Sequence, residues 1–203
     1  MATLFSDILA KGIRQGQVPA RTKSAREWYR NQAKTKAGKE MTAEAILSTT
    51  DKGRAKSQLR GDQVYGSMYF FEYDPKHKDT LPYYDKFPLA IIVGPAAGGF
   101  YGLNLHYLPA VLRAKFLDAL MDITSNKSYD ETTKFELSYK MLTASARMKF
   151  FKPCYKHYLN AHVKSRFARV PAPEWEIATF LPTADWQKSS GNKVYKDSRN
   201  MIR

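Results

Sequence analysis

The sequence predicts an α+β fold in which a small antiparallel, SH3-like sheet or partial barrel, at about residues 65–107, is surrounded by helices. Three runs of aromatic or aliphatic residues in this region are joined by short connections containing Gly and Pro, which favours strands linked by hairpins. Segments with apolar residues at helical spacing lie on both sides of these runs. With 203 residues and 43% hydrophobic content, the chain can bury a core.

The N-terminal segment is expected to form a basic helical arm. Residues 3–14 carry apolar side chains at helical spacing, and Gly16 and Pro19 follow them, so a short amphipathic helix is predicted there. Residues 20–40 are strongly basic and contain few aliphatic side chains, so a helix of that composition needs a partner surface to pack on. Residues 49–63 are polar and basic, which is typical of a linker.

Three central strands are predicted in the segments SMYFFEYD, FPLAIIVG and FYGLNLHYL, at residues 67–74, 87–94 and 100–108. The second segment is almost continuously apolar, which indicates a strand buried on both faces. Before it, LPYYDKFP places Pro82 and Pro88 on either side of two tyrosines, and Asp85 is expected to cap the turn between them. The sequence therefore favours a structural corner here over the lip of a catalytic pocket.

Helices are expected after the sheet. The first begins at Pro109, and its apolar stripe consists of Leu112, Phe116 and Leu120. Residues 134–151 and 153–170 predict two further helices, and residues 174–182 a short helix or turn. The polar tail at residues 183–203 is expected to pack onto the core or onto a neighbouring subunit.

Positive charge is concentrated in two parts of the chain, whose net charge is +14. Residues 1–60 hold 13 basic and 5 acidic residues (+8), residues 61–133 hold 6 and 9 (−3), residues 134–169 hold 9 and 1 (+8), and residues 170–203 hold 5 and 4 (+1). The predicted organisation is a basic helical arm and linker (1–60), a β-rich core with a helix (61–125), a basic helical segment (126–182) and a C-terminal tail (183–203).

This charge indicates a polyanionic partner, with nucleic acid first and an anionic membrane surface second. No apolar stretch reaches the roughly 18–20 residues of a membrane-spanning helix, so stable membrane insertion is not expected. The single cysteine, Cys154, rules out a disulfide between two cysteines of this chain and agrees with a reducing compartment.

Three carboxylates near the corner are candidates for acid–base chemistry or metal binding: Asp74, Asp79 and Asp85. Because they flank prolines and turns, turn capping is the simpler explanation. GPAAGG, at residues 94–99, lacks the lysine and the following helix of a phosphate-binding loop and predicts a hairpin turn.

Cys154, His157 and His162 raise the question of zinc, but a structural zinc site needs four ligands and the chain offers no second pair. His106, at a strand end, is expected to be a hydrogen-bonded histidine of the core or its rim. No catalytic, metal-binding or cofactor-binding residue is therefore predicted, and the protein is expected not to be an enzyme.

Basic residues interleaved with aromatic ones are the positive signal. Lys and Arg neutralise phosphates, and aromatic rings can stack on exposed bases, although these rings fit a buried core equally well. No sequence-reading DNA-binding motif is present, so contacts to the nucleic-acid backbone are expected. The predicted nucleic-acid-binding residues are Arg21, Lys23, Arg26, Arg30, Lys34, Arg147, Lys149, Lys152, Lys156, Lys164, Arg166 and Arg169.

The run YFFEYDPKHKDTLPYYDKFPLAIIV, with GFYGLNLHYLP after it, resembles a virion protein of T4-like tailed phages, in the family of DNA end protector proteins. The similarity covers residues 65–112, about a quarter of the chain, and extends to AREWYRNQAK and to the region near Pro153–His157. LPYYDKFPL is its most specific phrase.

The resemblance implies a non-enzymatic virion protein, present in the host cytoplasm during assembly, that shields the termini of the packaged double-stranded genome from exonuclease. Other virion proteins are then further partners. The alternative is a structural assembly protein of the baseplate, neck or tail, whose arms pack on neighbouring subunits and whose charge meets acidic protein surfaces.

Overall fold

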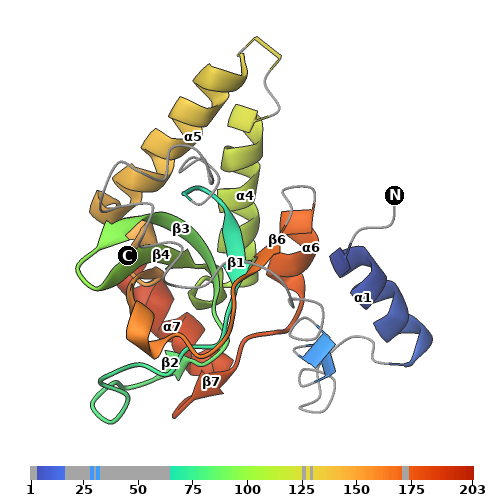
Figure 1. Cartoon of the computed structure of the whole chain (residues 1–203), viewed down its shortest axis with the longest axis vertical. Helices are drawn as coiled ribbons and strands as arrows, with labels where there is room; N and C mark the ends of the chain where they lie inside the picture. Colours follow the sequence, from blue (N-terminus) through green and yellow to red (C-terminus); the bar gives the residue numbers. More distant parts are fainter. Residues whose placement is uncertain are drawn as a thin grey trace.

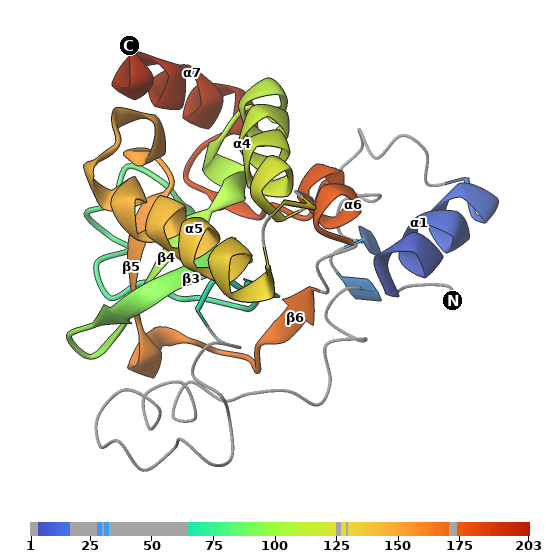
Figure 2. The same cartoon turned by 90° about the horizontal axis from the view of Figure 1, so that it is seen from above.

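An antiparallel sheet of five strands organises the part of the chain that the structure, a computed structural model, describes: residues 4–16, 28–29, 31–32, 65–124, 127–128, 130–170 and 174–203. Its strands lie in the order β5-β4-β3-β1-β6 (Figures 1 and 2). They span Tyr155–Leu159 (β5), Gly99–Asn104 (β4), Leu89–Ala96 (β3), Met68–Phe70 (β1) and Ala168–Val170 (β6). The predicted α+β class is confirmed, and the three central strands lie where they were expected.

Helices α4 (Ala110–Thr124) and α5 (Glu131–Ala144) cover one face of this sheet as an antiparallel pair (Figures 1 and 2). The predicted stripe on α4 is confirmed, because Phe116 and Leu120 are buried and Leu112 packs against the same cluster. Short helices α6 (Trp175–Phe180) and α7 (Gly191–Ile202) complete this side.

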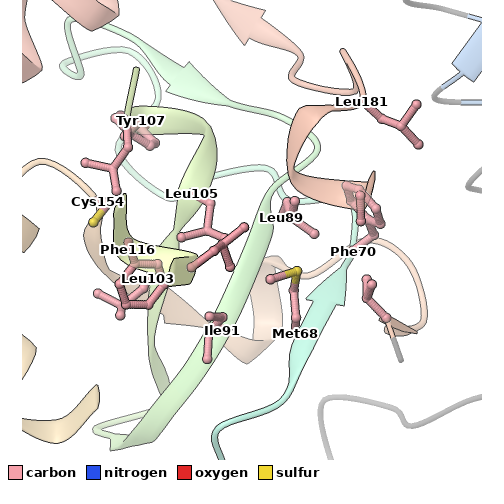
Figure 3. Close-up of a cluster of buried hydrophobic side chains, with 14 of the residues drawn as sticks. Met68, Phe70, Leu89, Ile91, Leu103, Leu105, Tyr107, Phe116, Cys154 and Leu181 are labelled. Atoms are coloured by element: carbon pink, nitrogen blue, oxygen red, sulfur yellow. The ribbon is translucent and has the colours of Figure 1, made fainter. Parts of the chain in front are cut away.

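The core on the helical face is mainly aliphatic, with some aromatic rings among its side chains. Met68 from β1, Leu89 and Ile91 from β3 and Leu103 from β4 pack with Phe116 of α4 (Figure 3). Each strand side chain is completely buried, so alternation along β1 and β3 directs every second residue to the helices.

The other face of the sheet is aromatic and concave, and its buried side chains are Tyr69, Phe71, Tyr73, Ala90, Ile92, Phe100, Tyr158 and Phe167. Two strands separate β1 from β5, which in a flat sheet would place these strands about 14 Å apart. Yet the ring centroids of Phe71 and Tyr158 are 5.1 Å apart, and those of Tyr73 and Tyr158 4.9 Å. The sheet therefore curls around this face.

Backbone hydrogen bonds hold the curl in place. The Asp74 amide donates to the His162 carbonyl over 3.0 Å, and the Lys164 amide donates to the Glu72 carbonyl over 2.8 Å. These bonds bring the chain after β1 against the segment after β5. The described strands nonetheless form an open, curled sheet and no closed barrel.

Residues 153–170 are not the helix that the sequence analysis predicts. They form β5, the 3₁₀ turn η6 (Asn160–His162) and β6, so the sheet extends well beyond residue 107 and the predicted basic segment is only partly helical. The physical reason is long-range: β5 pairs with the edge of β4, and β6 pairs with the edge of β1, which would otherwise leave backbone groups unpaired.

The predicted first helix is confirmed as α1 (Leu4–Arg14), followed by Gly16 with a φ of +70°. Ile8 of α1 and Tyr29 are buried, and α1 lies beside α6 at the periphery of the molecule (Figure 2). The predicted linker at residues 49–63 lies outside the described residues, and so does most of the basic segment at residues 20–40.

The proline corner, residues 81–88, is held by one buried carboxylate. Asp85 Oδ1 accepts hydrogen bonds from the amides of Phe87 (3.1 Å) and Asp185 (3.0 Å). Asp85 Oδ2 is bonded to Asn104 Nδ2 (3.1 Å) and to His106 Nδ1 (2.6 Å). The predicted turn-capping role of Asp85 is confirmed by the Phe87 bond, and His106 is a buried, hydrogen-bonded histidine as expected.

The C-terminal segment completes this corner. Strand β2 (Tyr84–Asp85) pairs with β7 (Trp186–Gln187), and the Lys188 ammonium donates to the Asp79 carbonyl over 2.8 Å. His106 Nε2 also lies 3.2 Å from the Thr183 hydroxyl. Val194 and Ser198 of α7 are buried, so the tail packs on the core, one of its two predicted positions.

Replacing Asp85 by Asn should lower the free energy of unfolding at pH 7 by about 2–4 kcal/mol, because one amide NH₂ group then faces buried donors in place of an acceptor. Asp74→Asn is the matched control, since Asp74 pairs with Lys78 at the surface and should contribute less than about 1 kcal/mol. Urea unfolding measures both, and equal effects would contradict the central role of Asp85.

The difference between wild type and Asp85→Asn should also shrink in acid. Burial acts to raise the pKa of Asp85, but His106 and the hydrogen bonds to Asp185 and Asn104 outweigh burial and lower it below the ordinary 3.8. A carboxylate whose pKa is lowered in the folded state stabilises the fold at any pH above the ordinary pKa. This stabilisation is lost as the pH falls through the lowered pKa of the folded state.

Candidate nucleic-acid interface

The predicted nucleic-acid-binding residues come from two parts of the chain, of which the structure describes the second. Those of the N-terminal arm lie outside the described residues: Arg21, Lys23, Arg26, Arg30 and Lys34. The others belong to the region after α5, and all of them except Lys156 are exposed: Arg147, Lys149, Lys152, Lys164, Arg166 and Arg169.

A C-terminal basic patch forms where the short helical turn η5 (Lys149–Phe151) packs on α7, with the turn η4 (Ser145–Arg147) packed against η5. The Lys149 ammonium donates to the main-chain oxygen of Arg203 and so joins the two elements. The patch consists of Arg147, Lys149, Lys152, Lys196, Arg199 and Arg203, all exposed.

Sequence analysis missed half of this patch. Lys196, Arg199 and Arg203 are spaced i, i+3 and i+7, which places them on one face of α7. This spacing could have identified the three cations from the sequence. The net charge of the last 34 residues is only +1, however, so charge counting does not single them out.

A second group, the edge-strand cations, consists of Lys164, Arg166 and Arg169. They lie along the segment that leads from η6 into β6, and β6 is an edge strand of the sheet. The Arg169 side chain is exposed between the buried Ala168 and Val170. The exposed cations of the predicted basic helical segment thus fall into two separate groups, one beside α7 and one at the β6 edge of the sheet.

The aromatic residues between these cations are mostly core. Phe151 and Tyr158 are almost completely buried, and Phe167 is completely buried in the concave face. Tyr155 is half-buried and stacks on Tyr101, with ring centroids 5.2 Å apart. Phe151, Tyr158 and Phe167 are therefore unavailable for base stacking, and of the two interpretations left open, the buried core holds for them.

The candidate acid and metal residues are spread over different contacts. Asp74 pairs with Lys78, and Asp85 is the buried centre of the corner. Cys154 is buried, which raises its thiol pKa to about 12, and His157 and His162 bond to the carbonyls of Ala97 and Asp74. Among the described residues, no three His, Cys, Asp or Glu side chains are grouped so as to hold a metal ion.

A pocket of about 530 Å³ opens beside the proline corner, at one end of the concave face. Its walls come from the turn after β1, from the corner, from the end of β4 and the turn that follows it, from β5 and from α7. Its aromatic and cationic lining residues include Tyr73, Tyr83, Tyr84, Tyr107, Lys156 and Tyr158, and the buried Asp85 and Asn104 also line it. The sequence analysis expected only a structural corner here, and the structure shows that the corner is also the wall of a cavity.

Among the described residues of the predicted set, Lys156 is the one that is not exposed, and its side chain is half-buried. It stands on the same face of β5 as Tyr158, opposite Gly102 of β4, which contributes no side chain. Its ammonium lies 4.0 Å from the centre of the Tyr107 ring, a cation–π contact. Burial lowers the pKa of Lys156 from 10.5 to about 8, against a smaller opposing effect of Cys154.

None of the described helices is long and apolar enough to cross a lipid bilayer. This agrees with the hydropathy of the sequence.

Lys156→Met should raise the free energy of unfolding at pH 7 by about 1–3 kcal/mol, because the fold no longer buries an ammonium whose pKa is lowered by about 2.5. The cost of burying the charge is fully present below pH 8 and is lost as pH rises toward 10.5, so the advantage of the variant should disappear over that range.

Thermal or urea unfolding of both proteins between pH 7 and pH 10 measures the effect, and Lys164→Met serves as the exposed control. Destabilisation by Lys156→Met at pH 7 would show instead that Lys156 supports the fold through its contact with Tyr107.

The comparisons with known proteins agree with the resemblance seen in the sequence. No curated protein and no solved structure matches the chain. The family model described as Phage T4 terminal DNA protecting protein matches residues 20–200. This span includes the basic segment at residues 20–40, the sheet, the proline corner and nearly all of α7. The similarity therefore reaches far beyond the central block at residues 65–112, and the chain belongs to the Phage T4 terminal DNA protecting protein family.

Proposed function

We propose that this protein binds the ends of double-stranded DNA in a phage virion and shields them from exonucleases without catalysing a reaction itself. The family match supports this function, because the family is named for protecting terminal DNA. The net charge of +14 is of the sign and size that a DNA-binding surface requires.

The C-terminal basic patch is the proposed main contact with the DNA backbone. Its six cations are exposed, and they come from η4, η5 and α7, which pack together and are joined by the Lys149–Arg203 hydrogen bond. The nearest acid on α7, Asp197, is already paired with Lys193 over 3.0 Å. Lys and Arg side chains arranged this way bind phosphates without reading base sequence.

The edge-strand cations and the predicted basic residues of the N-terminal arm are proposed as secondary contacts. They would follow the duplex away from its end and contact its phosphate backbone. Other virion proteins are the proposed neighbours of the protein, and the host cytoplasm is the compartment in which it joins the particle.

Replacing Arg147, Lys149 and Lys152 by Ala should weaken binding to a blunt linear duplex and reduce its salt dependence. Each lost phosphate contact lowers the slope of log K against log[salt] by about 0.9, so the triple variant should lose about 2–3 from the slope. Fluorescence anisotropy at several NaCl concentrations measures the slope.

The matched control replaces the three edge-strand cations by Ala, which removes the same charge elsewhere. We expect it to change the slope less and to leave protection of a linear duplex against an added exonuclease largely intact. A wild-type protein that binds no DNA at low salt, or that binds DNA but does not slow the exonuclease, would contradict the proposed function.

A further inference from the structure

We propose that the pocket beside the proline corner receives the terminal nucleotide of a DNA strand, with the nucleotide's phosphate at Lys156 and its base against the tyrosines of the pocket wall. This inference rests on the proposed function and deepens it, because it assigns recognition of the end to one site. The basic surfaces, by contrast, contact phosphates anywhere along a duplex.

The shape of the pocket suits such a ligand. Its volume of about 530 Å³ lies within the roughly 300–1,000 Å³ of small-molecule sites. It lies at the open end of a curled sheet, where the side chains of the concave face change from apolar rings to polar groups. Phe100, Gly102 and Asn104 mark this change along β4, since alternation places all three on one face.

The walls offer aromatic surface at the entrance. Tyr83 and Tyr84 line the pocket and are only half-buried, unlike the tyrosines of the concave face. The Tyr83 ring packs against the rings of Tyr107 and Trp186, at centroid distances of 6.2 and 6.3 Å. A base at the end of a strand can stack on such a ring, and stacking of this kind accepts any base.

The charges of the pocket favour an anion. Lys156 contributes an ammonium from β5, and Lys76 and His77 lie at the rim. Asp85 is the acidic residue of the lining, but both its oxygens are already engaged in the four hydrogen bonds that hold the corner. The Tyr73 hydroxyl accepts a bond from the Leu159 amide over 3.1 Å, and its own proton can be donated to a ligand.

Lys156 also needs an explanation that the fold does not provide. Within the described part of the chain its ammonium makes an aromatic contact and no ion pair, although burial of a charge ordinarily calls for one. Burial lowers its pKa to about 8, in the direction expected for an ammonium without an ion-pair partner. A phosphate in the pocket would supply the missing negative charge.

The test uses three DNA probes of the same sequence. The first is a hairpin duplex with one open blunt end carrying a 5′-phosphate, the second has a 5′-hydroxyl instead, and the third is closed at both ends and has no terminus. Wild type should bind the phosphorylated end at least tenfold more tightly than the closed DNA, and the 5′-hydroxyl end less tightly than the phosphorylated one. Anisotropy at fixed salt gives the three dissociation constants.

Lys156→Met should abolish the preference for an end and leave affinity for the closed DNA unchanged, whereas Lys164→Met, an exposed lysine outside the pocket, should retain the preference. Tyr84→Ala provides a second pocket variant that leaves every charge in place, and it should reduce the preference several-fold. Thymidine 5′-monophosphate should compete for the open end, and thymidine should compete more weakly.

The outcomes separate this inference from the proposed function. Equal binding of open and closed DNA, unchanged by both pocket variants, would overturn the pocket assignment and leave DNA binding intact. No binding of any probe at low salt would overturn both. Competition by the free nucleotide without a preference for ends would show that the pocket takes a free nucleotide, and so would also overturn its assignment to the terminus.

Discussion

The buried Asp85 carboxylate joins parts of the chain that are distant in sequence, and the remaining structure is arranged around it. Its two oxygens connect the proline corner, the end of β4, His106 and the C-terminal segment. A carboxylate inside a protein is costly unless its oxygens accept several hydrogen bonds, and here each accepts two. The C-terminal segment is therefore part of the core, and it brings α7 and its cations next to η5.

The same arrangement gives the corner two roles. Pro82, Pro88 and Asp85 fix the backbone, and the rigid wall they form bounds a cavity with Lys156 on its far side. Asp85 and Lys156 differ in how their charges are satisfied: Asp85 has four hydrogen-bonding partners, whereas Lys156 has an aromatic ring. Binding sites typically retain charged groups that lower the stability of the fold. The contrast therefore identifies Asp85 as a structural residue and Lys156 as the candidate ligand-binding residue.

Prediction from sequence succeeded where local chemistry decides the structure. Turns rich in Gly and Pro bounded β1, β3 and β4, and the stripe on α4 identified its buried face. It was wrong for residues 153–170, because Tyr155 and Tyr158 are spaced as on a helix while Lys156 and Tyr158 alternate as in a strand. The exposed cations of residues 147–169 were recognisable from the charge imbalance, but those of α7 were not, and neither was the pocket, which draws on five separate segments.

By itself, the sequence determined the α+β class, the structural corner and the resemblance to the DNA-protecting family. Turn geometry, helical spacing and family motifs depend on residues that are close together in the sequence. Only the tertiary structure decided that β5 and β6 extend the sheet, that Phe151, Tyr158 and Phe167 face inward, and that Lys156 is withdrawn into a pocket. These properties depend on strand pairing and burial between residues far apart along the chain, such as Gly102 with Lys156 and Asp85 with Asp185. Local sequence patterns do not specify which distant partners meet.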